Sequence, residues 1–398
     1  MKNYNLTFIG ACLCFFMQAL VINVFPFYFT TFSDLYGISV RQLTFLTTLI
    51  FAVQFTIDAF GYRIADKIGY KNCIFLCSGC VLVGFISVAA TINLIKPFIS
   101  IIIGIIFSSF GGGLIETITS PMVEALPFKS KSAKMSLLHS FYCWGHLLAV
   151  LSCTLFMLFI PKESWYLSLL IWLIIPICAI LVFIKAPVEQ LAEDELSSGG
   201  KKLFTNKIFI CALLAIAFAG AIEQGLAQWI SYFTEKTLNM NKSTGDLLGT
   251  CAFALCMAIS RTSYGLLGHK LNLSVTLIVS SLCACVGILC IPSDVTALSV
   301  IGIIVAGLSI GILWPGILSL TTNSNVNGGT RMFSFLALLG DAGCLTGPLV
   351  LGSIASSTSF KAGMTANAVY GAFIAVCVTL IILINKNKAK NASNSPEN

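Results

Sequence analysis

The chain has 398 residues, of which 57% are hydrophobic and only 10% charged, and its mean hydropathy is +0.93. Soluble domains carry far more charge. The composition therefore excludes soluble multidomain enzymes, nucleic-acid-binding proteins and secreted disulfide scaffolds, and it leaves a polytopic membrane protein embedded in a lipid bilayer.

Apolar runs that end at charged or turn residues predict twelve membrane-spanning helices. Each run is long enough to cross the hydrocarbon core, which takes about 20 residues. Together they leave too little chain for a separate soluble domain. In chain order the predicted spans are 6–31, 42–62, 73–93, 97–124, 134–159, 165–185, 208–232, 244–266, 272–292, 296–321, 331–355 and 363–385.

One connection is much longer and more polar than the others, and it divides the spans into two sets of six. It contains Glu193-Asp194-Glu195 and Ser197-Ser198-Gly199-Gly200 and is typical of a flexible linker. We therefore predict a six-helix bundle at 1–185, a cytoplasmic linker at 186–207, a second six-helix bundle at 208–385 and a disordered cytoplasmic tail at 386–398.

The distribution of basic residues predicts the orientation. If both termini are cytoplasmic, 17 of the 23 Lys and Arg residues lie on the cytoplasmic side, as the positive-inside rule requires. The net charge of +7 is thus better explained by topology than by an anionic ligand. The first span contains Pro26 and has no small-residue cleavage site, so we expect it to be retained. We expect the protein in a plasma or inner membrane.

The two halves repeat one another weakly. Ile64-Ala65-Asp66-Lys67-Ile68 matches Leu267-Gly268-His269-Lys270-Leu271, and Gly113-Leu114-Ile115-Glu116 corresponds to Gly311-Ile312-Leu313-Trp314. Duplicated halves predict a substrate site at their interface, near the membrane midplane.

The segment from Ile64 to Lys71 resembles the cytoplasmic loop signature of the major facilitator superfamily, Gly-x-Leu-Ala-Asp-Arg-x-Gly-Arg-Lys. Gly61 lies one place early and Tyr62 takes the glycine position. The resemblance implies an all-α membrane protein of two pseudo-symmetric six-helix bundles. It also implies a gate in which an acid at a helix end pairs with basic residues, for which the candidates are Asp66, Lys67, Lys71 and Arg261. A solvated loop would carry similar charges.

Ionisable side chains deep in a membrane helix cost about 2.5 to 3.5 kcal/mol each and are functional candidates. The deep acids are Glu116, Glu223 and Asp341, whereas Asp58 and Glu124 lie nearer the cytoplasmic ends of their spans. Glu116 is roughly 18 Å of helix before Phe128, close to mid-bilayer. A carboxyl in that environment is expected to exchange a proton near neutral pH, as proton coupling requires. The alternative is a carboxyl hydrogen-bonded between helices.

Other polar and aromatic side chains in the spans are candidates for substrate binding. Amides or acids beside an indole suit a sugar, which offers hydroxyls to the polar groups and an apolar face to the ring. Interhelical hydrogen bonds, or an aromatic belt in the case of Trp229, would explain the same residues. The candidates are Gln18 and Asn23 in the first span, His139, Tyr142 and Trp144 in the fifth, and Gln224, Gln228 and Trp229 beside Glu223 in the seventh.

A narrower resemblance joins several of these positions. The string from Gly111 to Thr117, with Pro121, resembles the fourth-span pattern of the fucose:proton symporter group and related glucose transporters, although Ser120 replaces an Asn. Matching segments are His139-Ser140-Phe141-Tyr142-Cys143-Trp144-Gly145, Glu223 with Trp229, Trp314-Pro315, and Gly340-Asp341-Ala342-Gly343 with Pro348 and Gly352.

This resemblance implies a monosaccharide substrate taken up with protons by alternating access, with Glu116 and Glu223 as coupling acids and Trp314 among the binding residues. The fucose symporter is expected to use a second acid in its first span, and this chain has none there. Three possibilities remain open: Glu223 takes that role, coupling uses one acid, or transport is uncoupled or driven by sodium.

The chain is not expected to be an enzyme or to bind a cofactor or metal. It has no P-loop or HExxH motif, and Cys77 and Cys80 lie in an apolar span without a nearby His or acid. The main rival is a drug:proton antiporter of the same fold, which would carry Gly-Pro in the fifth span, whereas Gly347-Pro348 lies in the eleventh. A non-transporting membrane sensor would require a signalling domain.

Overall fold

The computed structural model describes residues 3–189, 203–240, 244–245, 247–324, 326 and 329–393, and every regular element within them is helical. The chain divides by its internal contacts into two compact units. The N-terminal unit comprises Met1–Lys129 and Leu138–Leu191, and the C-terminal unit comprises Ser130–Leu137 and Ala192–Asn398. Eleven helices among the described residues are long and apolar enough to cross a membrane.

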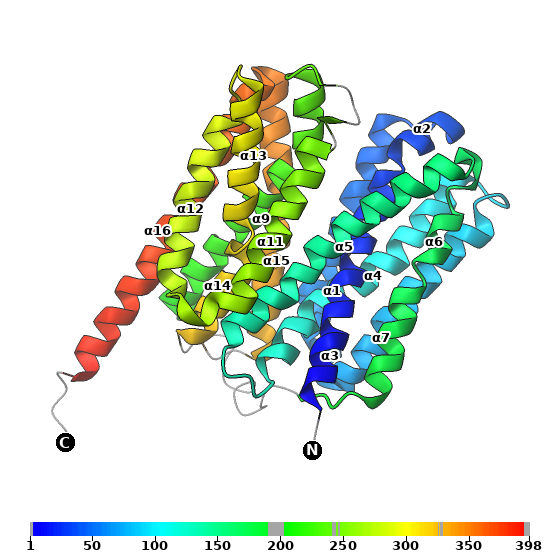
Figure 1. The fold of residues 1–398 in the computed structure, drawn as a ribbon. Helices are drawn as coiled ribbons and strands as arrows, with labels where there is room; N and C mark the ends of the chain where they lie inside the picture. The colour runs from blue at the N-terminus through cyan, green and yellow to red at the C-terminus, as the bar shows by residue number, and fades with distance from the viewer. Residues whose placement is uncertain are drawn as a thin grey trace. The chain divides into compact units, whose positions relative to one another are not determined.

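The N-terminal unit is built around α4, which packs against α1 and α3, while α7 packs against the same two helices (Figure 1). The first eight residues of the Ser130–Phe159 stretch belong to the other unit. The helices from the N-terminus are α1 (Tyr4–Phe27), α2 (Phe29–Tyr36), α3 (Val40–Thr91), α4 (Pro97–Glu124), α5 (Lys131–Phe159), η1 (Lys162–Ser164), α6 (Leu167–Ile171) and α7 (Ile174–Lys185).

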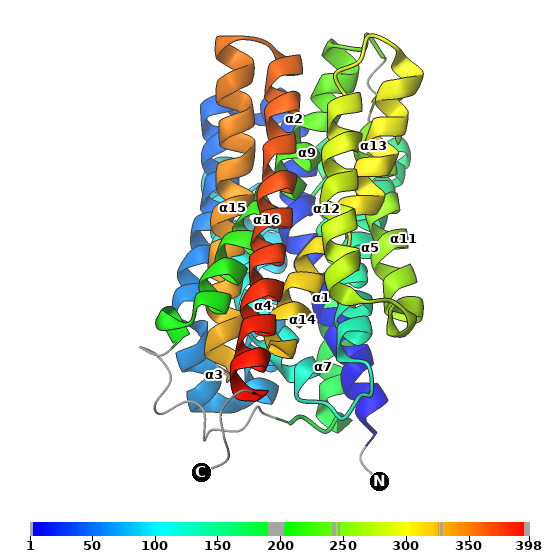
Figure 2. The same cartoon turned by 90° about the vertical axis from the view of Figure 1, so that its left-hand side faces the viewer.

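The C-terminal unit is built around α9, which packs against α14, α15 and α16. Figure 2 shows α12 beside α13 and α16, in agreement with their packing contacts. Its elements are α9 (Lys207–Lys236), a π-helical turn η3 (Leu247–Cys251), α11 (Ala252–Leu267), η4 (Gly268–Lys270), α12 (Leu273–Cys290), α13 (Thr296–Ile310), α14 (Leu313–Asn323), α15 (Gly329–Ser357) and α16 (Phe360–Ser393).

The count of eleven is reconciled with twelve predicted spans by a break inside α3. Gly69 has φ 78° and ψ 156°, which is not helical, and it separates the predicted spans 42–62 and 73–93. This backbone conformation is open almost only to glycine. Gly69, which matches the second glycine of the loop signature, is thus the residue at which the chain turns from one membrane-spanning helix to the next.

We expect Gly69→Ala to lower the stability of the protein by about 1–3 kcal/mol, because a Cβ strains this conformation. Gly79→Ala is the matched control in the same helix, since a Cβ at Gly79 would meet nothing within 4 Å. The control should be neutral or slightly stabilising. Thermal unfolding of the purified variants in detergent measures both effects, and equal melting temperatures for the two would contradict the strain argument.

Several predicted spans differ from the observed helices at their ends or contain a break. The span 6–31 ends as α1 at Phe27, the span 165–185 is divided between α6 and α7, and the span 296–321 is divided at Gly311 and Ile312. The expectation of a disordered tail from residue 386 is wrong in part, because α16 remains helical to Ser393. Most of the predicted linker, residues 190–202, lies outside the described residues.

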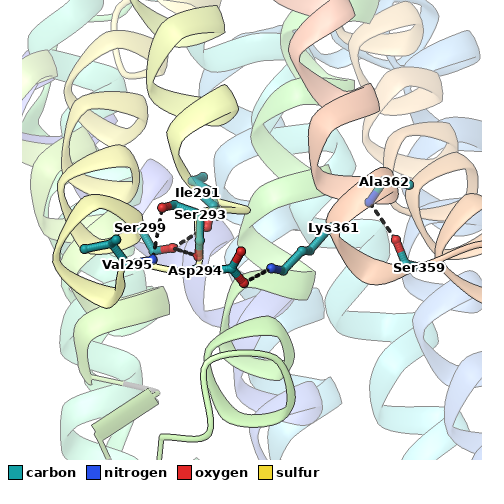
Figure 3. A network of polar contacts seen from close by, with 8 residues as sticks. All are labelled: Ile291, Ser293, Asp294, Val295, Ser299, Ser359, Lys361 and Ala362. Carbon is teal, nitrogen blue, oxygen red and sulfur yellow. Dashed lines mark hydrogen bonds and ion pairs between the residues drawn. The ribbon is translucent and has the colours of Figure 1, made fainter.

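The α12–α13 connection is joined to the first turn of α16 by an ion pair between Asp294 and Lys361 (Figure 3). Ser299 bonds back to the carbonyl oxygens of Ile291 and Ser293, and the hydroxyl of Ser359 accepts from the N–H of Ala362 at the start of α16. The acid of this pair is 94% exposed. The pair therefore closes a surface loop and contributes little to stability.

Candidate functional site

The first part of the candidate site is a hydrogen bond between two predicted site residues in the N-terminal unit. The side-chain amide of Gln18, on α1, donates to the carboxylate of Glu116, on α4. Gln18 is buried and Glu116 is partly buried. The structure thus brings together a residue predicted to bind substrate and one predicted to couple protons.

A second carboxylate lies beside this pair. Asp58, on α3, is fully buried, and its Oδ1 accepts a hydrogen bond from Thr117 Oγ1 at 3.1 Å. Thr117 is the residue after Glu116 on α4, so Asp58 lies at the depth of Glu116. The sequence had separated these two acids by depth, and the hydrogen bond now places them at one level of the unit. No pattern in the sequence signals the pairing, because the two residues are far apart along the chain.

A third polar residue, Gln54, lies on α3 one helical turn before Asp58. It is fully buried, and neither of its amide atoms has a hydrogen-bond partner among the described residues. A Cβ placed on Gly112 would lie 2.8 Å from Gln54 Nε2 and 3.2 Å from Val21 on α1. The absence of a side chain at Gly112, one turn before Glu116, is therefore what admits Gln54 between α1 and α4.

The predicted residues of α5 lie beside the same helices. His139 is buried, its Nε2 is 3.3 Å from Ser120 Oγ, and its ring packs on Phe15 with centroids 4.4 Å apart. Tyr142 and Trp144 are partly buried. This hydrogen bond between α4 and α5 agrees with the alternative to substrate binding, in which His139 joins two helices. In α1, the amide of Asn23 donates at 2.8 Å to the carbonyl of Ala19 in its own helix.

The C-terminal unit holds a buried ion pair. Arg261 Nη2, on α11, is 2.8 Å from Glu223 Oε2, on α9, and these residues are 2% and 7% exposed. Arg261 was expected among the gate residues, and the structure places its side chain in the interior of the C-terminal unit, near the end of α11. Its role in gating stays a prediction.

The second partner of Arg261 is the carbonyl oxygen of Gly311, which a proline leaves without its usual helical hydrogen bond. In an α-helix the N–H of residue 315 would bind the carbonyl oxygen of Gly311, but Pro315 has no N–H. The helix breaks there, and Arg261 Nε donates to the Gly311 oxygen at 2.7 Å. The Trp314-Pro315 motif was thus the sequence signal for an acceptor at this level.

The remaining candidates of the C-terminal unit are dispersed. Trp229 Nε1 donates to the carbonyl of Pro348 at 3.1 Å, and its ring packs near Phe360. Trp314 is buried, with its ring against Gly340. Gln224 is partly buried and Gln228 is exposed. These contacts account for both indoles as packing residues, and their role in substrate binding stays a prediction.

The other three predicted gate residues, Asp66, Lys67 and Lys71, lie around the turn at Gly69. Asp66 and Lys67 are exposed, and Lys71 Nζ donates to the carbonyl of Ile184 at 3.0 Å, at the end of α7. Lys71 therefore ties the α3 turn to α7 within the N-terminal unit. The role of the two exposed residues in a gate stays a prediction.

The two units offer different chemistry to their acids. Glu116 faces the amide of Gln18, and Asp58 faces the hydroxyl of Thr117; an amide and a hydroxyl can each donate to a carboxylate or accept from a carboxylic acid. Glu223 faces a guanidinium, which has donors only. Protonation of Glu223 would remove the negative charge that strengthens its hydrogen bond to Arg261. The carboxyls of the N-terminal unit are thus better suited to change their protonation state.

Long apolar helices that carry buried carboxylates define an integral, multi-pass membrane protein. The family model for the major facilitator superfamily matches residues 7–325 and again 236–398. The chain therefore belongs to this superfamily of membrane transporters. A curated relative, an uncharacterized transporter of this superfamily from Yersinia pestis, is 25% identical over 154 residues, and the match spans 38% of each chain.

Solved structures agree with this fold. The E. coli fucose:proton symporter FucP has a TM-score of 0.81 at 17% identity, with 96% of this chain and 99% of that chain covered. The proton:xylose symporter XylE has a TM-score of 0.79 at 10% identity, with 94% of each chain covered. A human organic anion transporter has a TM-score of 0.71 at 15% identity, with 94% and 98% covered. The similarity to the fucose group expected from the sequence is confirmed at the level of the fold.

Proposed function

We propose that this protein imports a small polar solute, a monosaccharide, together with protons by alternating access. The observation that carries the proposal is the bond between Gln18 and Glu116, which holds a carboxyl in the interior of the N-terminal unit against a side chain that suits both of its protonation states. The fold similarity to two sugar:proton symporters supports the same substrate class. We further propose that both termini are cytoplasmic and that the membrane is a plasma or inner membrane.

Glu116 is the coupling acid in this mechanism. In the outward-open state it takes a proton from the more acidic side and loses the charge that a membrane interior disfavours. Gln18 can then turn its amide oxygen toward the new carboxylic acid, so the proton is accommodated without a lost hydrogen bond. Sugar binding selects the closed state, and both solute and proton leave on the inner side.

Glu223 has a different part in this proposal. Its bond to Arg261 favours a charged carboxylate at all stages. We propose that the ion pair fixes the position of α11 relative to α9, and that it affects coupling through this position. Sugar contacts are assigned to the polar and aromatic candidates of both units, Gln18, His139, Tyr142, Trp144, Gln224 and Trp314 among them.

Uptake into proteoliposomes tests the proposal. Purified protein is reconstituted and supplied with labelled L-fucose, D-xylose, D-glucose, amino acids, cationic dyes and organic anions under an imposed pH or sodium gradient. We expect a monosaccharide to accumulate when the outside is acidic, and an equal sodium gradient to have no effect. Protein-free liposomes are the control for leak.

Each alternative has its own result in this assay. Export of a dye against an inward proton gradient would identify the antiporter. Accumulation driven by the sodium gradient would identify sodium as the coupling ion in place of the proton. Equilibration without accumulation would identify a uniporter. Uptake of an organic anion alone would overturn the sugar assignment.

A further inference from the structure

We propose that Asp58, which is bound by Thr117 beside Glu116, is a second proton-carrying carboxyl and takes the place of the acid missing from the first span. This inference rests on the proposed proton coupling and names its second residue. Asp58 is fully buried in α3, and its carboxylate is bound by the residue that follows Glu116 on α4. The two acids thus lie on adjacent helices at one depth.

Thr117 allows Asp58 to exist in either protonation state. Its single hydroxyl proton has two acceptors within reach, Asp58 Oδ1 at 3.1 Å and the carbonyl of Gly113 at 3.2 Å. When Asp58 is charged, the hydroxyl donates to it. When Asp58 is protonated, the hydroxyl donates to Gly113 and its oxygen accepts from the carboxylic acid. The bond to Gly113 is the usual contact of a helical threonine with the carbonyl four residues earlier, and it gives the hydroxyl proton an acceptor in both states.

Two buried amides point to the same region of α4. Both amide atoms of Gln54, and Oε1 of Gln18, lack a hydrogen-bond partner among the described residues. Gln54 abuts Gly112, and Gln18 binds Glu116 one turn later. Buried polar atoms are seldom left unpaired. The spare donors and acceptors of these two amides beside α4 can form new hydrogen bonds when a proton moves from one carboxyl to the other.

Within the described part of the chain, the helices that pack most extensively against α3 carry few charged side chains. Of the helices that pack against α3, α1 and α6 carry no acidic or basic side chain, α7 carries only Lys185 at its end, and α4 carries Glu116 and Glu124. On α3 itself the next turn holds Tyr62 and Arg63, and the exposed Arg63 lies over the rings of Phe60 and Tyr62. Among these helices, Glu116 is the acid next in sequence to Thr117, the residue that binds Asp58.

Infrared difference spectroscopy between acidic and alkaline pH tests the pair without any knowledge of the substrate. The full-length protein in lipid should show two protonated-carboxyl bands, one lost in Asp58→Asn and the other in Glu116→Gln. Interacting carboxyls titrate as a pair. In Asp58→Asn the Glu116 band should therefore change its pH midpoint by about one unit. Asp34→Asn, at an exposed acid of α2, is the control and should leave both bands unchanged.

Thr117 provides a second test that does not depend on the folding of an Asp58 variant. Thr117→Val removes the hydroxyl and should shift the midpoints of both bands, whereas Thr117→Ser keeps it and should reproduce the wild-type titration. Unchanged midpoints in Thr117→Val, or an Asp58→Asn spectrum identical to wild type, would overturn the inference. If the bands are coupled but no sugar accumulates under a pH gradient, the proposed function fails; if sugar accumulates while Asp58→Asn leaves the spectrum unchanged, only the second carboxyl fails.

Discussion

Glu116→Gln is expected to abolish proton-driven accumulation of the solute while exchange of internal for external solute continues. Glutamine cannot carry a proton, but it can still hydrogen-bond to Gln18, so the local packing is preserved. With one proton per solute, a gradient of one pH unit can drive roughly tenfold accumulation in the wild type. The variant should reach only the external concentration, which labelled uptake and counterflow in proteoliposomes measure side by side.

The control for this experiment is Glu163→Gln, which changes an exposed acid of η1 in the same unit. It should accumulate the solute as the wild type does. Uphill accumulation by Glu116→Gln would show that another group carries the proton and would remove the main support for the mechanism. Loss of both accumulation and exchange would assign Glu116 to substrate binding instead.

Breaking the ion pair of the C-terminal unit should have the largest effect on stability. Arg261→Met or Glu223→Leu alone leaves one buried charge without its partner, which typically costs about 3–5 kcal/mol. The double variant Glu223→Leu with Arg261→Met removes both charges and should recover most of that loss. Thermal unfolding and the yield of monodisperse protein measure the three variants against the wild type.

Lys361→Met is the matched control, because it breaks the exposed pair with Asp294 and should cost no more than about 1 kcal/mol. A double variant no more stable than the single ones would mean that the partners of Arg261 besides Glu223, such as the Gly311 carbonyl, dominate its contribution. A stable, folded Arg261→Met would contradict the structural role proposed for the pair.

The positions of the membrane helices could be predicted from the sequence because lipid imposes a local rule. A backbone in hydrocarbon must satisfy its own hydrogen bonds, so each crossing is an apolar run of defined length. The span 97–124 coincides with α4, and most other spans differ from their helices only at the ends. The breaks at Gly69 and Gly311 depend on a positive φ and on a proline acting at a distance of four residues, and hydropathy does not report either.

The sequence also pointed to Glu116, Glu223 and Gln18 as candidates, because an ionisable or amide side chain in an apolar span is costly, and the family resemblance added Arg261 as a gate candidate. Only the tertiary structure decided which of them meet. In the structure Gln18 binds Glu116, Arg261 pairs with Glu223, and Asp58 lies at the level of Glu116. Pairing depends on how helices distant in sequence are rotated and displaced against one another, which is set by packing across the whole unit and leaves no periodic trace in any single span.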